Sequence, residues 1–130
     1  MATPHRLEIQ VRFGDTDALG HVNNAAYASY AELGRLEFLK MLGKHVTNLI
    51  LASLYIDYRR QVQYDDRVHI ETWIDSLGRS SMTIAQAIYA NDQLAADVKS
   101  VVVHFDYGAG KSMPLADDMR AVLESYRLPA

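Results

Sequence analysis

The sequence predicts an α+β domain in which one long helix lies against the concave side of an antiparallel sheet of about five strands. Residues 24–42 form the one long segment with a wide apolar face. A short strand candidate precedes this segment, and four strand candidates follow it with no second long helix between them. One strand, one long helix and then consecutive antiparallel strands form a two-layer domain of this class.

The first two predicted elements are separated by a loop. Residues 7–13 alternate apolar and polar side chains with period two, which predicts a half-buried strand. Asn23 is a good N-cap for the helix, and Gly43 is typical of the residue that ends one. Gly34 in mid-helix costs stability relative to alanine, which indicates a close approach to another backbone. The predicted apolar face comprises Tyr27, Tyr30, Ala31, Leu33, Gly34, Phe38, Met41 and Leu42.

The second half of the chain is predicted to be mainly strands. The strand candidates are residues 51–63, 67–76, 80–90 and 94–107, separated by turn residues. Residues 117–126 could form a short helix, because acidic residues in its first turn complement the helix dipole.

Composition places the chain among soluble globular proteins of one domain, residues 1–130. Apolar residues make up 49% of the chain and charged residues 22%, so it can bury a core without a disulfide or a metal. The net charge is −3, with acidic and basic residues interspersed, which argues against nucleic-acid binding. The absence of cysteine excludes a disulfide framework.

The expected location follows from two segments. Residues 1–6 contain no apolar run, so we expect no signal peptide. The longest uncharged apolar segment, residues 46–56, is too short to span a bilayer. We therefore expect a soluble, cytoplasmic protein that does not act at a membrane.

The loop between the first strand and the helix contains two aspartates and a histidine. Gly20 permits the chain to turn back towards the helix start. This turn places Asp17 beside unpaired N–H groups of the first helical turn, whose dipole favours an ionised carboxylate. Such a pair can attack a polarised carbonyl, or activate water to attack it. Alternatively, Asp15 and Asp17 only form turns, because aspartate side chains bond their own backbone in loops.

Short segments with recognisable residue combinations occur in the loop and at several later positions, over most of the chain. They are Phe13-Gly14-Asp15-Thr16-Asp17, Gly20-His21-Val22-Asn23-Asn24, Tyr64-Asp65-Asp66, Gly78-Arg79-Ser80 and Val103-His104-Phe105-Asp106-Tyr107, with Tyr27, Tyr30 and Glu32. On these residues the chain resembles the hotdog-fold acyl-CoA thioesterases of the 4-hydroxybenzoyl-CoA thioesterase type. The resemblance implies a hotdog fold, in which a curved sheet wraps a long central helix.

The resemblance also implies an activity. The expected reaction hydrolyses an acyl-CoA, or an acyl carrier protein thioester, to a carboxylic acid and the free thiol, CoA-SH in the first case. Asp17 occupies the position of the reactive aspartate, as general base or nucleophile, and Asp15 has a structural role. Backbone N–H groups at the helix start, those of Asn24 and its neighbours, would bind the thioester oxygen and its oxyanion. No cofactor is implied.

Three residues near this site are assigned to substrate binding, each with a structural alternative. We expect His21 to shape the loop or to bond near the thioester rather than to act as a base. Tyr27 either lines the acyl pocket or belongs to the core. Glu32 faces the acyl pocket, or pairs with Arg35 three residues along the helix, or is exposed at the helix edge. The four other histidines show no ligand spacing with His21, so no metal site is expected.

The coenzyme A phosphates are assigned to basic residues. Arg79 and Ser80 stand where members of the family often contact these phosphates, and Arg79 could pair with one in bidentate fashion. The alternative is that Gly78-Arg79-Ser80 is an ordinary turn. Arg59 and Arg60 are further candidates.

Two other functions remain open. One is the hydratase branch of the hotdog fold, whose signature pairs an Asp and a His around an Asn-Pro; here Ala18, Leu19 and Gly20 separate the two and no proline is present. The other is a non-catalytic acyl-CoA-binding or regulatory module. A Gly-x-Ser-x-Gly elbow and cysteine are both absent, so the common serine and cysteine hydrolase routes are unsupported.

We expect a homodimer, or a dimer of dimers, with each active site shared between chains. A small sheet curled around one helix leaves a strand edge with unpaired backbone groups. Two copies related by a twofold axis can pair such edges. The resemblance implies the same arrangement, with the Asp17 loop of one chain facing strands of the other and CoA along the junction.

Overall fold

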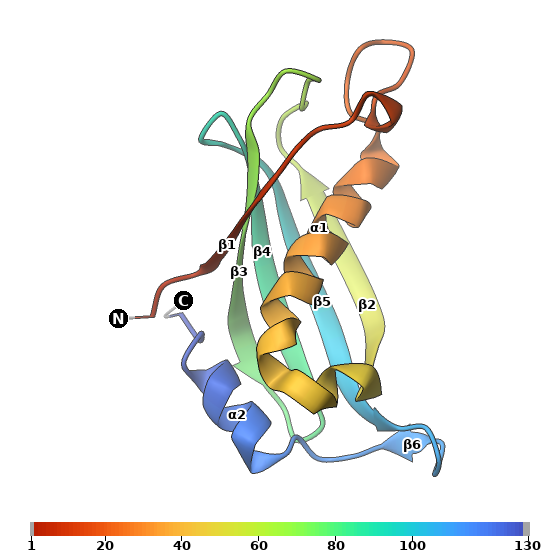
Figure 1. Cartoon of the computed structure of the whole chain (residues 1–130), viewed down its shortest axis with the longest axis vertical. Helices are drawn as coiled ribbons and strands as arrows, with labels where there is room; N and C mark the ends of the chain where they lie inside the picture. Colours follow the sequence, from red (N-terminus) through yellow and green to blue (C-terminus); the bar gives the residue numbers. More distant parts are fainter. Residues whose placement is uncertain (1, 129–130) are drawn as a thin grey trace.

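A curved antiparallel sheet wraps one side of a long helix in this computed structural model (Figure 1). The strand order is β1-β3-β4-β5-β2, and β6 pairs with β5. In chain order the elements are β1 (His5–Ile9), η1 (Phe13–Asp15), α1 (Asn24–Leu39), η2 (Lys40–Asn48), β2 (Leu49–Tyr58), β3 (Val68–Leu77), β4 (Ser81–Ala90), β5 (Gln93–Asp106), β6 (Lys111–Ser112) and α2 (Asp117–Glu124). This is the α+β hotdog arrangement that the sequence predicted.

The structure describes residues 2–128. Met1, Pro129 and Ala130, which the predicted domain 1–130 includes, lie outside the described residues, as does the start of the segment predicted to lack a signal peptide. No helix within the described part of the chain is long and apolar enough to cross a membrane. The cytoplasmic location stays a prediction.

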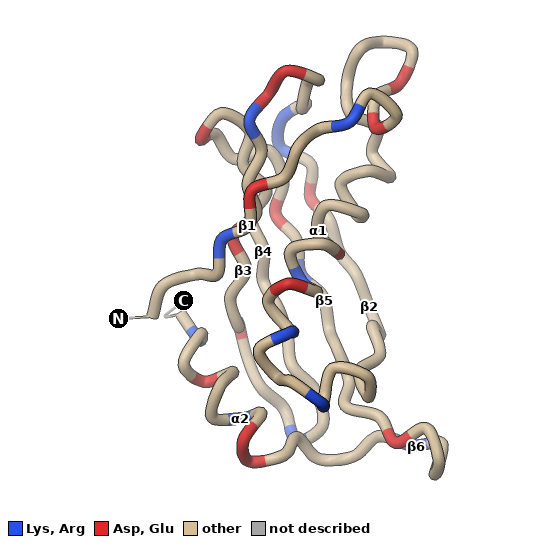
Figure 2. Tube along the Cα trace, viewed as in Figure 1, with Lys and Arg blue, Asp and Glu red and all other residues tan. Residues whose placement is uncertain are grey.

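Acidic and basic residues are interspersed along the chain, without a face of one sign in this view (Figure 2).

The central strands confirm the predicted alternation. In β3, Val68, Ile70 and Ile74 are buried, whereas Glu71 and Trp73 between them are only half-buried. β3, β4, β5 and α2 begin and end within two residues of their predicted bounds. Period-two alternation is a local signal, and it is strong where one face of a strand meets a core.

The long helix ends earlier than predicted. α1 ends at Leu39 rather than at residue 42, and the chain continues as the 3₁₀ segment η2. Gly43 lies inside η2 with a φ of 58°, where it reverses the chain direction. A positive φ is open to glycine at little cost, so Gly43 turns the chain as expected but not at the α-helical end.

Two predicted strand ends were wrong. β1 stops at Ile9 instead of residue 13, because the Arg12 N–H donates to the Asp15 carboxylate (3.0 Å) and the chain turns into η1. Phe13, placed in the strand by the prediction, is 80% exposed. β2 stops at Tyr58 instead of residue 63, because the chain leaves the sheet where two successive N–H groups share one carbonyl of β5.

The helix packs on the sheet through a face narrower than predicted. Gly34 lies so close to the sheet that an added Cβ would stand 2.8 Å from Ile70 Cγ2 and 3.0 Å from Gln86 Nε2. Gly34 therefore does allow a close approach, but to side chains of the sheet and not to another backbone as predicted. Leu33 and Met41 were predicted in the apolar face but are 49% and 38% exposed, because they lie away from the sheet.

Candidate active site

Asp17 lies in a tight exposed loop at the end of the molecule where α1 begins (Figure 1). Its backbone N–H donates to the His21 carbonyl (2.8 Å), and the Gly20 N–H donates to the Asp17 carbonyl (3.1 Å). Asp17 Oδ1 accepts from the N–H groups of Leu19 (2.8 Å) and His21 (3.3 Å). Gly20 has a φ of 85°, as the turn requires. The turn-forming role is therefore present, and within residues 2–128 Oδ2 receives no hydrogen bond.

Asn23 fixes the start of α1 beside this loop. Its Oδ1 accepts from the Ala26 N–H (2.9 Å), which confirms the predicted N-cap. Its Nδ2 and its backbone N–H both donate to the Asp15 carbonyl (3.0 and 2.9 Å). The N–H groups of Asn24 and Ala25, the first two helical residues, have no intrahelical acceptor. They are open donors at an exposed helix start.

Asp15 anchors the loop from below with a buried carboxylate that is 7% exposed. Oδ2 accepts from the Arg12 N–H (3.0 Å) and the Tyr30 hydroxyl (2.7 Å), and Oδ1 accepts from Arg12 Nη2 (3.2 Å). Burial alone would raise the pKa of Asp15, but these hydrogen bonds outweigh it and hold that pKa below its usual value. Burial, followed by the bond to Asp15, raises the pKa of Tyr30, so its hydroxyl stays a donor.

Tyr27 belongs to the core, which was the structural alternative for this residue. It is 2% exposed, and its hydroxyl donates to the Arg60 carbonyl (3.1 Å) and accepts from the Val62 N–H (3.1 Å). Tyr58 packs edge-on against it, with ring centroids 5.1 Å apart. The Tyr58 hydroxyl donates to the Asn24 carbonyl (3.1 Å) and so ties β2 to the helix start.

His21 shapes the loop through its backbone. Its N–H and carbonyl both bond Asp17, and it forms an isolated bridge with Gln63. The half-buried imidazole forms no hydrogen bond within the described residues. No group of three or more His, Cys, Asp or Glu side chains in that part of the chain is arranged to bind a metal ion.

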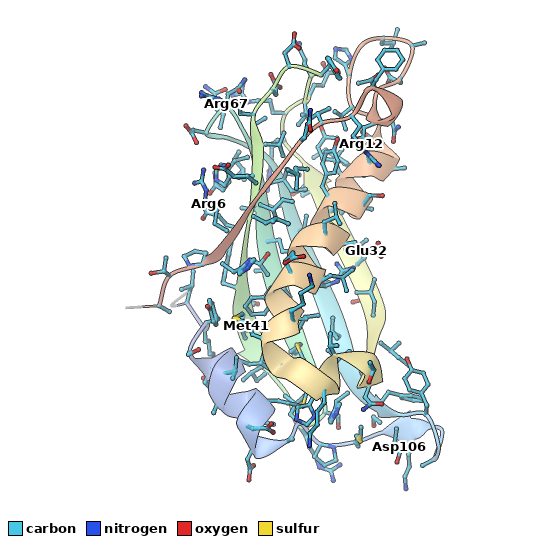
Figure 3. The ribbon with its side chains drawn as sticks, viewed as in Figure 1. Arg6, Arg12, Glu32, Met41, Arg67 and Asp106 are labelled. Atoms are coloured by element: carbon cyan, nitrogen blue, oxygen red, sulfur yellow. The ribbon has the colours of Figure 1, made fainter. Side chains whose placement is uncertain are left out.

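A groove of about 440 Å³ runs between β1 and α1. It is lined by Ile9, Gln10, Arg12, Ser29, Tyr30, Glu32 and Leu33. Arg12 lies near its upper end, and Glu32 extends from the middle of the helix (Figure 3). Glu32 is exposed, as one of its structural alternatives predicted, and among residues 2–128 it forms no ion pair with Arg35.

Arg79 and Ser80 lie in the turn between β3 and β4, at the opposite end of the long axis from the Asp17 loop (Figure 1). The ten-residue strand β3 alone spans about 33 Å at ~3.3 Å per residue, so Arg79 cannot reach Asp17 of its own chain. The Arg79 carbonyl accepts from the Leu115 N–H (2.9 Å), and the Ser80 carbonyl from the His104 N–H (2.8 Å). These two hydrogen bonds show that the turn also connects to β5 and to the segment before α2.

The two other arginines proposed for CoA lie at the Asp17 end. Arg59 is held by Asp57 and Asp97, each at 2.9 Å, so its charge is already matched. Arg60 is exposed, and its carbonyl accepts from Tyr27. Of these two, Arg60 has the freer side chain.

Comparison with known proteins identifies the family. A family model described as the thioesterase-like superfamily matches residues 11–123. The chain belongs to this superfamily. The thioesterase-like chain is similar to the long-chain acyl-CoA thioesterase FadM of Escherichia coli, with 27% identity over 125 residues that cover 90% of this chain and 95% of the relative.

Two further similarities extend this result. The acyl-acyl carrier protein thioesterase ATL3, chloroplastic, of Arabidopsis thaliana is 46% identical over 115 residues, 82% of this chain and 60% of the relative. A crystal structure of a thioesterase complexed with coenzyme A and Zn, from Thermus thermophilus, superposes with a TM-score of 0.87 at 31% identity and covers 96% of both chains. The hotdog thioesterase family and its homology to acyl-CoA thioesterases are thus confirmed, whereas the roles of individual site residues stay predictions.

Sequence reasoning missed two contacts of the candidate site. Tyr58 reaches the first turn of α1 from β2, and Arg12 bonds the carboxylate of Asp15. The Arg12 contact had a local signal, because a carboxylate three residues after a basic residue in a turn can close back on it. The Tyr58 contact spans 34 residues and had none.

Proposed function

We propose that this chain hydrolyses acyl thioesters, releasing a carboxylic acid and CoA-SH from acyl-CoA. Membership of the thioesterase-like superfamily and similarity to FadM support the reaction class. One observation carries the assignment of the site: the Asp17 carboxylate, whose Oδ2 receives no hydrogen bond from the described residues, lies in the loop that leads into the open N–H donors of Asn24 and Ala25. A reactive carboxylate beside oxyanion donors is the arrangement that acyl transfer needs.

The proposed mechanism uses the two carboxylate oxygens of Asp17 differently. Oδ1 is held by the N–H groups of Leu19 and His21, which orients Oδ2. Oδ2 either removes a proton from water or attacks the thioester carbonyl itself. The carbonyl oxygen accepts from the Asn24 and Ala25 N–H groups as negative charge develops on it. In the general-base route, collapse of the tetrahedral intermediate breaks the C–S bond and releases the carboxylic acid, and the proton that Asp17 took from water passes to the thiolate to give CoA-SH. In the nucleophilic route, collapse leaves a mixed anhydride on Asp17 and the thiolate takes a proton from solvent; a water molecule then hydrolyses the anhydride, which releases the carboxylic acid and restores Asp17.

We propose that a twofold homodimer, alone or as half of a dimer of dimers, completes the site. Arg79 and Ser80 would then contact CoA bound at the Asp17 loop of the other chain, since they cannot reach Asp17 of their own. The dimer is supported by β2, an edge strand on which Leu51, Leu54 and Tyr55 are 42%, 39% and 64% exposed. A long apolar edge strand is a template for pairing with another chain. Two copies of it can pair antiparallel about the axis.

The substrate is proposed to lie across the exposed helix start. The thioester would sit against His21 and the Asn24 N–H. The acyl group would follow α1 through the groove that Glu32 lines. Tyr27 would support this site from the core through the backbone of Arg60 and Val62.

The experiment that tests the proposal measures thiol release from a panel of acyl-CoA and acyl carrier protein thioesters. Asp17→Asn should lower kcat by about 10²–10⁴-fold on the best substrate, since it removes an ionisable group but nearly keeps its shape. Asp65→Asn is the matched control and should leave kcat unchanged, because Asp65 is an exposed aspartate in the connection between β2 and β3.

The outcomes separate the candidate functions. Activity of Asp17→Asn within about tenfold of wild type would exclude Asp17 as the reactive group. Binding of acyl-CoA by the wild-type chain without thiol release from any substrate would identify a non-catalytic binding module instead. Circular dichroism and urea unfolding show whether the variant is folded.

A further inference from the structure

The groove between β1 and α1 contains a carboxylate that no neighbouring cation pairs with. Of the residues that line the groove, Arg12 and Glu32 carry charges (Figure 3). Arg12 Nη2 lies 3.2 Å from Asp15 Oδ1, so this cation is already paired. Glu32 is exposed, and within residues 2–128 it takes part in no ion pair. The groove therefore presents one unmatched negative charge to a molecule that enters it.

Arg35, three residues further along α1, does not supply the missing partner. Burial lowers the pKa of Arg35, and the nearby Glu32 carboxylate opposes this effect, but the two side chains form no ion pair within the described part of the chain. Arg35 is 6% exposed and is not among the residues that line the groove. Glu32 is thus available to a cation from a bound molecule.

The other residues of the groove lining carry no charge. They are Ile9, Tyr30 and Leu33, which form apolar walls, and the neutral polar residues Gln10 and Ser29. A neutral alkyl chain in this groove would take the Glu32 carboxylate partly out of water without giving it a partner, which is unfavourable. An alkyl chain that ends in a cation replaces the lost water by a charge-assisted hydrogen bond. The lining therefore fits an apolar body with a cationic end.

The position of Glu32 along α1 sets the length of the matching chain. Glu32 is eight residues after Asn24, the first residue of α1, so the two levels differ by about 12 Å at ~1.5 Å per residue. An extended chain advances ~1.2 Å per bond, because a residue of three backbone bonds spans ~3.6 Å. Helical side chains lean towards the helix start, so the Glu32 side chain covers part of the distance. A chain of about eight carbons from a thioester at Asn24 therefore ends beside Glu32.

We propose that Glu32 determines specificity by selecting acyl groups of medium length whose far end carries an ammonium or guanidinium group. The inference rests on the proposed function, which puts the thioester at Asp17 and the acyl group in this groove. It adds the chemical class of the substrate: an ω-amino or ω-guanidino acyl thioester instead of a plain fatty acyl thioester. Glu32 acts in two ways, because it attracts the cation and also disfavours a neutral chain that would bury its carboxylate.

Binding of matched acyl-CoA probes tests the charge preference. The probes are ω-aminooctanoyl-CoA, nonanoyl-CoA with a methyl group in place of the ammonium, and nonanedioyl-CoA with a carboxylate there. Isothermal titration calorimetry gives each Kd in an Asp17→Asn chain, in which the probes should persist. Adding Glu32→Gln should reduce the preference for the amino probe over nonanoyl-CoA by at least about threefold, since glutamine keeps the shape but not the charge. Adding Glu32→Lys should shift the preference from the amino to the carboxylate probe by at least about tenfold.

Glu37→Gln is the matched control. Glu37 lies on the same helix, but it is paired with Lys40 at 2.6 Å and is not among the groove residues, so its replacement should leave both preferences unchanged. Glu32 is exposed, so its replacement does not disturb the core, and circular dichroism checks the fold of each variant. A shift smaller than about threefold in Glu32→Gln overturns the inference. An equal shift in Glu37→Gln overturns it as well.

Thiol release by chains that retain Asp17 separates this inference from the proposed reaction. Hydrolysis of the probes without a charge preference that depends on Glu32 overturns the inference and leaves the hydrolase assignment in place. A preference in binding that depends on Glu32, without thiol release from any probe, supports the inference and removes the hydrolase assignment. Failure of the chain to bind any of the probes overturns both.

Discussion

The two ends of the molecule are built from different interactions. Around the start of α1 the core consists largely of valine, alanine and tyrosine, and the tyrosine hydroxyls bond the backbone or Asp15. Around α2 the core contains Phe38, Met82, Met119 and Leu123, all fully or almost fully buried. The end at the start of α1 is positioned by hydrogen bonds, which are directional, whereas the end at α2 is stabilised by the packing of large apolar side chains.

This difference suggests that one end of the molecule sets the orientation of the candidate site, whereas the other end supplies more of the stability of the fold. Hydrogen bonds have preferred distances and angles, so a few of them can orient a loop such as that of Asp17. Apolar burial has no direction, but it supplies most of the favourable free energy of folding. We therefore expect changes near α2 to affect unfolding more than turnover, and changes near the helix start to do the reverse.

The largest effect on stability is expected for Phe38→Ala. Phe38 is 1% exposed and packs edge-on against Tyr126, with ring centroids 5.1 Å apart. Truncation of a buried phenylalanine costs about 3–5 kcal/mol of the free energy of unfolding. Urea unfolding measures that loss, and kcat of the remaining folded protein should stay within about threefold of wild type. Lys44→Ala, at an exposed position of η2, is the control.

An intermediate effect is expected for Tyr30→Phe. The change removes a 2.7 Å hydrogen bond to the buried Asp15 carboxylate, and bonds to charged groups contribute about 1.5–3 kcal/mol. Because Asp15 also holds Asn23 through its carbonyl, kcat should fall more than in Phe38→Ala. If the unfolding free energy falls but kcat is unchanged, the hydrogen bonds at the start of α1 do not orient the candidate site.

The same variant should alter the acid sensitivity of the protein. The folded pKa of Asp15 is depressed, so its contribution to stability is present above the unfolded value of about 3.9 and is lost as pH falls through the folded pKa. Tyr30→Phe removes one cause of that depression. Between about pH 5 and pH 3 its unfolding free energy should therefore fall less than that of wild type. Urea unfolding across this range gives both slopes, and parallel slopes would refute the assignment.

The smallest change in stability is expected for Asn23→Ala, at about 1 kcal/mol for a lost N-cap. Turnover should nevertheless fall, because the same amide donates to the Asp15 carbonyl and aligns the loop with the helix. Ala116→Ser is the matched change at the other end, since the N-cap of α2 has no side-chain hydrogen bond. It should raise stability by up to about 1 kcal/mol and leave kcat unchanged. Equal changes of kcat in both variants would remove the distinction between the two ends.

Local signals explain what the sequence could predict. The alternation in β3, the N-cap at Asn23 and the turn at Gly20 each depend on residues within a few positions of one another, and the structure confirms all three. The position of Asp17 in the loop before the helix was predicted for the same reason. Its chemistry stays a prediction.

Contacts between distant residues explain what the sequence could not predict. β1 ends early because Asp15 turns the chain and is itself held by Tyr30, fifteen residues away. Leu33 is exposed and Arg35 is buried, the reverse of their polarity, because the direction in which each leaves α1 depends on where the sheet edges lie. The separation of Arg79 from Asp17 follows from strand connectivity, which short motifs do not encode.

The contact at Gly34 restricts the route of a bound ligand. An added Cβ would stand 2.8 Å from Ile70 Cγ2, so not even one methyl group fits between α1 and the sheet at that level. A methylene chain is at least as wide as a methyl group, and it cannot thread beneath the helix there. If the proposed acyl group enters at Asp17, this contact directs it along the outside of α1, and the proposal then predicts that residues on the flanks of the helix, rather than those of the inner core, set which chain lengths fit.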